Sequence, residues 1–99
     1  MTAPDVWVAK DDGSDLVRAE AIAAVGRDYN GNVTVRLVGS EGAAVTLVAV
    51  APHEGKHTPV DFHHQLIRLV SQMSDAAGPA VVHPAWDERK GWYWVTDRL

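Results

Sequence analysis

Residues 22–37 read IAAVGRDYNGNVTVRL, and this stretch decides the fold. At its centre, Asn30-Gly31 is the strongest two-residue hairpin signal, because both residue types tolerate a positive φ. Apolar and polar residues then alternate over residues 33–37, which predicts a strand. A hairpin needs a second strand before its turn. We therefore expect residues 22–29 to form that strand.

The residues before this hairpin allow two interpretations. The alanine content of residues 16–25 and the glycine at position 26 fit a helix that ends at Gly26. The hairpin favours two short strands instead, over residues 16–19 and 22–29, joined by a bend at Glu20. We adopt the strands and keep the helix as the alternative.

Four further segments have strand character. Residues 6–9 predict a short strand by alternation. Residues 44–51 form a nearly continuous apolar run, typical of a central strand that is covered on both faces or meets a partner chain. Residues 80–83 and 91–96 predict a last hairpin around a turn at residues 87–90.

One helix is expected near residues 59–77. Thr58 suits the N-cap position and Pro59 the first helical position. The Gly78-Pro79 pair ends the helix. Between these signals, one apolar stripe runs at helical spacing, formed by Phe62, Leu66, Leu69, Val70 and Met73.

Together these elements predict one α+β domain over residues 1–99. We expect two layers: a twisted, mostly antiparallel sheet of five to seven strands with the amphipathic helix packed on it. The apolar run at residues 44–51 is long for such a sheet. It predicts either a curled half-barrel or an exposed face that meets a second copy.

The composition is that of a globular protein. Of 99 residues, 46% are hydrophobic and 22% are charged, which is ordinary for a folded domain. The absence of cysteine excludes disulfides, thiolate nucleophiles and Cys-ligated zinc. A net charge of −4 argues against general nucleic-acid binding. The sequence shows no signal peptide and no apolar run near the ~20 residues of a membrane span, so a cytoplasmic protein without membrane association is expected.

Four histidines are close together in the sequence. Neutral imidazole is the commonest zinc ligand, and a site could combine His53, His57 and His63. No known zinc motif is present, and His63 and His64 would point about 100° apart on a helix. A solvated loop is therefore the favoured interpretation, and we expect no cofactor.

Aromatic and basic residues gather near the end of the chain. Such residues are typical of protein interfaces, and bases of single-stranded nucleic acid also stack on aromatic rings near cations. In a strand, Trp92 and Trp94 share one face while Tyr93 and Val95 share the other, so one pair belongs to the core. The candidate interaction surface consists of Trp86, Arg89, Lys90, Trp92 and Trp94.

No catalytic motif is recognisable. The sequence lacks a nucleophile elbow, a Gly-rich phosphate loop and the spacing of a calcium loop. A domain of this size rarely encloses a catalytic pocket alone. We therefore predict no catalytic residues and a non-catalytic interaction or regulatory module, which binds a protein partner or a second copy of itself. A histidine-loop metal-binding protein or enzyme and a single-stranded nucleic-acid-binding domain are the alternatives.

Overall fold

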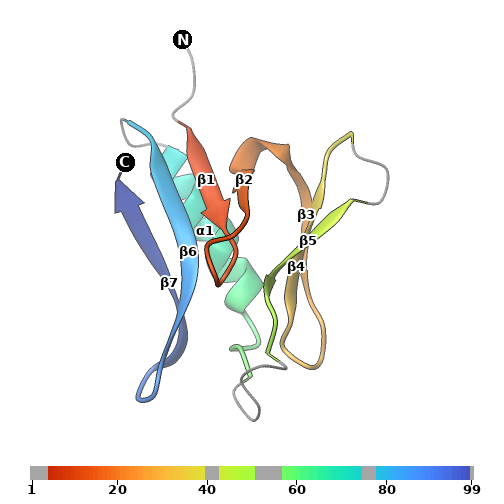
Figure 1. Ribbon diagram of the computed structural model, residues 1–99, viewed down its shortest axis with the longest axis vertical. Helices are drawn as coiled ribbons and strands as arrows, with labels where there is room; N and C mark the ends of the chain where they lie inside the picture. The colour runs from red at the N-terminus through yellow and green to blue at the C-terminus, as the bar shows by residue number, and fades with distance from the viewer. Residues whose placement is uncertain (1–4, 40–42, 51–56, 75–77, 99) are drawn as a thin grey trace.

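The computed structural model describes residues 5–39, 43–50, 57–74 and 78–98. Within them, seven strands and one α-helix form an α+β structure (Figure 1), which confirms the predicted fold class. No helix in these ranges is both long and apolar enough to cross a lipid bilayer. The elements are β1 (Val6–Ala9), β2 (Leu16–Arg18), η1 (Ala19–Ala21, a short 3-10 helix), β3 (Ile22–Arg27), β4 (Val33–Leu37), β5 (Ala44–Val48), α1 (Phe62–Ser74), β6 (Ala80–Asp87) and β7 (Gly91–Arg98).

The strands are divided between two sheets, where the sequence pattern suggested one. The first has the order β2-β1-β6-β7 and the second the order β3-β4-β5. Neighbouring strands are antiparallel except β1 and β6, which are parallel. The chain passes from β2 through η1 into β3, and so crosses between the sheets (Figure 1). The strand interpretation of residues 16–25, with its bend at Glu20, is therefore confirmed.

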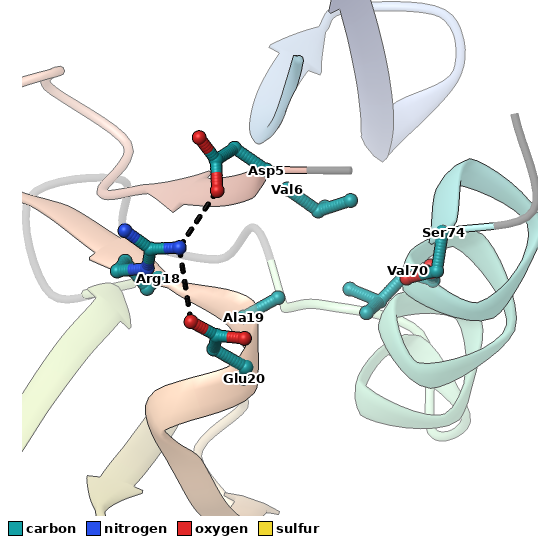
Figure 2. Close-up of a pocket in the computed structure, with 7 residues that line it drawn as sticks. All are labelled: Asp5, Val6, Arg18, Ala19, Glu20, Val70 and Ser74. Carbon is teal, nitrogen blue, oxygen red and sulfur yellow. Dashed lines mark hydrogen bonds and ion pairs between the residues drawn. The ribbon is translucent and has the colours of Figure 1, made fainter. Parts of the chain in front are cut away.

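Arg18 connects the bend at Glu20 to the beginning of β1. Its Nη2 donates to Asp5 Oδ1 at 2.7 Å and lies 2.9 Å from Glu20 Oε1 (Figure 2). The guanidinium carbon lies 5.4 Å from the centre of a Trp7 ring. A cavity of about 130 Å³ lies between these charged side chains and Val70 on α1. All three charged side chains are substantially exposed, and exposed ion pairs contribute less than about 1 kcal/mol.

The predicted β3–β4 hairpin is present, but its turn differs from the expected one. Strand β3 ends at Arg27, and Asn30 lacks the positive φ that a type I′ turn needs. Only Gly31 in this loop has one, at 95°. Its N–H donates to Asp28 O at 3.0 Å. The Asp28 carboxylate accepts a hydrogen bond from the Asn32 N–H at 2.9 Å. The strands are therefore joined by a loop over residues 28–32 and not by the expected two-residue turn.

Helix α1 begins later than predicted because Thr58 is used elsewhere. The Gln65 N–H donates to Asp61 O at 3.0 Å, so Asp61 occupies the N-cap position. The Thr58 hydroxyl donates to Gly31 O at 2.6 Å and accepts from Arg27 Nε at 2.9 Å. Arg27 Nη2 also donates to Thr58 O at 2.7 Å. We call Arg27, Gly31 and Thr58 the hairpin clamp, because they fasten the approach to α1 onto the β3–β4 hairpin.

The core lies between α1 and the inner faces of both sheets. The buried members of the apolar run at residues 44–51 belong to this core, whereas Ala44 and Thr46 are exposed. Within the described part of the chain, the apolarity of that run thus reflects burial in the shared core. The core residues are Val6, Val8, Val33, Val35, Leu47, Val48, Val50, Phe62, Leu66, Val82 and Trp92.

Candidate interaction site

The residues predicted to form an interaction surface all lie in the β6–β7 hairpin. The two strands pair in an unbroken antiparallel register along their eight residues each. The Asp87 carboxylate accepts hydrogen bonds from the backbone N–H groups of Arg89 at 2.7 Å and Lys90 at 3.1 Å. These bonds lower the pKa of Asp87 and fix the turn. The hairpin is therefore ordered up to its tip.

Its tryptophans lie on the inner face. Trp92 is only 5% exposed and belongs to the core. The Trp94 ring stacks on Phe62 with centroids 4.5 Å apart, and its Nε1 donates to Phe62 O at 2.9 Å. Trp86, directly opposite Trp92, packs partly buried against the same core. Of the two pairs that alternate along β7, the tryptophan pair is thus the inner one. Its rings anchor the hairpin to α1 and the core.

The outer face of the hairpin carries a different set of side chains. Tyr93 and Val95 are half-buried and Asp97 is exposed. The Lys90 ammonium lies 5.4 Å from the centre of the Tyr93 ring. Asp97 Oδ2 lies 3.1 Å from His83 Nε2. This face therefore presents two apolar side chains of β7 between a cation and an anion.

The second side of β7 is not paired with any strand in the described ranges. The strand order places β7 at the edge of the four-stranded sheet (Figure 1). Backbone N–H and C=O groups on such an edge can pair with another chain. Residues 92–96 contain neither a charge nor a proline, the features that commonly protect edges.

The other three edges of the described sheets are less suited to pairing. β2 has only three residues. β3 and β5 both belong to pairings with a register irregularity. Leu47 O on β5 already accepts a hydrogen bond from the Asp11 N–H at 2.8 Å. β7, with eight residues and no register shift, is the longest regular edge among the described strands.

The histidines proposed as metal ligands are not brought together where the structure describes them. His57 Nδ1 lies 2.7 Å from Asn30 O. His63 lies on α1, and its buried Nδ1 contacts no hydrogen-bonding group among the described residues. Burial, with the neighbouring His64, lowers the pKa of His63. His53 lies outside the described residues. Within them, no three histidine or acidic side chains are placed to hold a metal ion.

The Lys90 ammonium and the tryptophans also lie apart. Lys90 sits over Tyr93 on the outer face, whereas Trp92 and Trp94 point inward. A stacking site for single-stranded nucleic acid needs rings and cations on one surface. Tyr93, Val95 and Asp97 were not selected from the sequence, because alternation gives two faces without saying which is inner. No protein-family model, curated protein or solved structure matches this chain.

Proposed function

We propose that this chain is a non-catalytic protein-interaction module that self-associates along the edge of β7. The observation that carries the proposal is the length and regularity of this edge, with its uncharged centre. In strand addition, main-chain hydrogen bonds supply affinity and the flanking side chains supply specificity. Both kinds of group are present on β7.

The anchoring of the hairpin favours such a contact. Trp92 is buried, and Trp94 is held by both stacking and a hydrogen bond to Phe62. Strand β7 is therefore extended before any partner arrives, and association need not order it. Preorganisation of this kind increases affinity, because it reduces the conformational entropy lost on binding.

The contact area nevertheless sets a limit on affinity. Two paired edge strands with their neighbouring side chains form an interface smaller than the standard ~1,600 Å². We therefore expect a reversible dimer with a dissociation constant in the range of about 1–100 µM.

Sedimentation velocity over a concentration series tests this proposal with two matched variants. Val95 and Val81 are both half-buried valines on the outer face, but Val95 lies on the edge strand and Val81 on the interior strand β6. Val95→Lys places an edge lysine at the contact, so we expect it to remain monomeric. Val81→Lys should associate nearly as the parent chain does.

Two outcomes would overturn the proposal. If the parent chain is still monomeric at about 500 µM, its dissociation constant lies above the expected range and the proposed self-association is wrong. Equal loss of association in both variants would show that the outer face, rather than the edge, makes the contact. Thermal unfolding of each variant, followed by circular dichroism, confirms that the compared chains are folded.

A further inference from the structure

We propose that the hollow between the β1–β2 turn and the tip of the β6–β7 hairpin binds an organic cation, with its apolar part against Trp86 and its charge near Asp11. This site does not depend on the proposed self-association. The dimer contact uses the backbone edge of β7, whereas the hollow lies where the two sheets approach each other. Trp86 was selected from the sequence as an interaction residue, and the hollow gives it a ligand.

Three separate parts of the fold border this hollow, which has a volume of about 490 Å³. The first is the turn after β1, at residues 10–12, the second is the β6–β7 hairpin, and the third is Ala49 just beyond β5. The Asp11 N–H donates to Leu47 O at 2.8 Å, so the turn is fixed against β5 beside the hairpin (Figure 1). Ligand sites are commonly hollows of about 300–1,000 Å³ that are largely formed before the ligand binds, and this hollow is of that size.

The hairpin contributes an apolar wall. Trp86 and Trp92 lie directly opposite each other on the inner face, and Pro84 lies on the same face of β6. Trp92 is buried in the core, whereas Trp86 is half-buried and can contact a ligand over a larger area. The face of an indole ring carries a negative electrostatic potential and attracts a cation within about 6 Å. The wall therefore favours a ligand that has both apolar groups and a positive charge.

The turn contributes a negative charge that is not balanced. Lys10 Nζ lies 3.9 Å from Asp12 Oδ2, so these two charges offset each other. Asp12 Oδ1 also accepts hydrogen bonds from the backbone N–H and the hydroxyl of Ser14, at 2.9 and 2.6 Å. The half-buried Asp11 makes no side-chain hydrogen bond or ion pair with any residue that the structure describes. Its carboxylate is therefore the charge at the hollow that a ligand would balance.

The wall and the carboxylate together select the class of ligand. A neutral apolar compound would use the wall but would leave Asp11 without a counter-charge. An anion would meet two carboxylates and an ammonium that Asp12 already neutralises. A bare metal ion would find too few ligands, because no three acidic or histidine side chains in the described ranges can hold one. An alkylated ammonium group suits both features, since its methyl groups can pack on Trp86 while its charge lies near Asp11.

Three probes of nearly the same shape test this choice: choline, its neutral analogue with carbon in place of nitrogen, and the anion tert-butylacetate. Each is titrated at constant ionic strength while the indole Nε1–H resonances of the isotopically labelled chain are followed by NMR. We expect choline to shift the Trp86 resonance with a dissociation constant on the order of 1 mM. The other two probes should bind at least about fivefold more weakly. Trp7, on the outer face beside Arg18, is the internal control and should not shift.

Three substitutions test the residues that hold the cation. Asp11→Asn keeps the shape of the side chain but removes its charge, so the affinity for choline should fall about fivefold or more. Asp15→Asn is the matched control, because Asp15 lies in the same turn, is exposed and does not border the hollow. It should change the affinity less than about twofold. Trp86→Leu keeps an apolar wall but removes the ring face, so choline should lose its advantage over the neutral analogue. For that variant, the Trp92 resonance reports both binding and folding.

The outcomes decide the proposal as follows. Preferential binding of choline that is lost in Asp11→Asn but kept in Asp15→Asn supports the site. The proposal is overturned if the neutral analogue binds as tightly as choline, if the anion binds more tightly, or if the two asparagine variants have the same affinity. It is also overturned if about 50 mM choline leaves the Trp86 resonance unshifted. Once choline binds, a tripeptide with a trimethylated lysine distinguishes two sources of the cation. Tighter binding of the tripeptide identifies a protein side chain, and weaker binding identifies a free ammonium compound.

Discussion

Replacing Thr58 by valine should destabilise this protein more than any other change to a single hydroxyl group in the described residues. Thr58 is only 3% exposed. Its hydroxyl donates to Gly31 O and accepts from the Arg27 guanidinium. Valine has nearly the same shape but can do neither. In the valine variant, Gly31 O and Arg27 Nε each lose the hydrogen bond to the hydroxyl. Because the position of residue 58 is buried, no water molecule can take the place of that hydroxyl.

The expected magnitude follows from the two bonds. A neutral hydrogen bond contributes about 1 kcal/mol, and one to a charged group contributes about 1.5–3 kcal/mol. The free energy of unfolding should therefore fall by about 2–4 kcal/mol. For a domain of this size, such a loss lowers Tm by roughly 10–30 °C. Because the clamp joins the β3–β4 hairpin to the approach to α1, the loss should affect cooperative unfolding of the whole fold.

Urea denaturation followed by circular dichroism and tryptophan fluorescence measures this loss. Thr58→Ser is the matched control, since it keeps the hydroxyl and removes one buried methyl group, at a cost of about 1 kcal/mol. The reasoning is refuted if the valine and serine variants have the same free energy of unfolding. That result would mean that burial of the methyl group, and not the hydroxyl bonding, makes Thr58 important.

Three further outcomes follow from described contacts. Burial lowers the pKa of His63 from its ordinary value of 6.5, so the unfolded chain takes up a proton first and stability falls as the pH drops below 6.5. His63→Leu should therefore reduce the difference in unfolding free energy between about pH 7.5 and about pH 5.5, measured by urea denaturation at both. Trp94→Phe keeps the stacking on Phe62 but loses the bond to its carbonyl, and should cost about 1 kcal/mol in the same assay. Arg18→Met removes two exposed ion pairs and the contact of the guanidinium with the Trp7 ring and should change stability by less than about 2 kcal/mol, with the part due to the ion pairs decreasing in high salt.

Local sequence signals predicted the elements of this fold well. The Asn30-Gly31 pair marked a real hairpin, and the apolar stripe of α1 does face the core through Phe62 and Leu66. Both signals depend on neighbours in the sequence. The start of α1 could not be predicted in the same way. Thr58 has the chemistry of an N-cap, but its hydroxyl is bound to the distant Gly31.

The division of the strands into two sheets could not be predicted from local sequence patterns either. The strands separate where the chain turns from β2 through η1 into β3, and the four-stranded sheet depends on the parallel pairing of β1 with β6, which sets Val8 beside Val82. Alternation predicts that a segment is a strand, but it does not say which strand lies beside it. The edge position of β7 follows from this pairing, so the candidate site emerges only once the sheet order is known.

Stability and association should depend on alternate residues of the same strand. Trp94 points inward and holds β7 to α1, whereas Val95 points outward beside the edge. A change at Trp94 should lower the free energy of unfolding, and self-association should persist as long as the chain is folded. Replacing Val95 by lysine should weaken self-association and leave the free energy of unfolding nearly unchanged, because the core loses no side chain while the edge gains a charge. If both substitutions altered both properties in parallel, association would depend on global stability, and β7 would not be the specific contact.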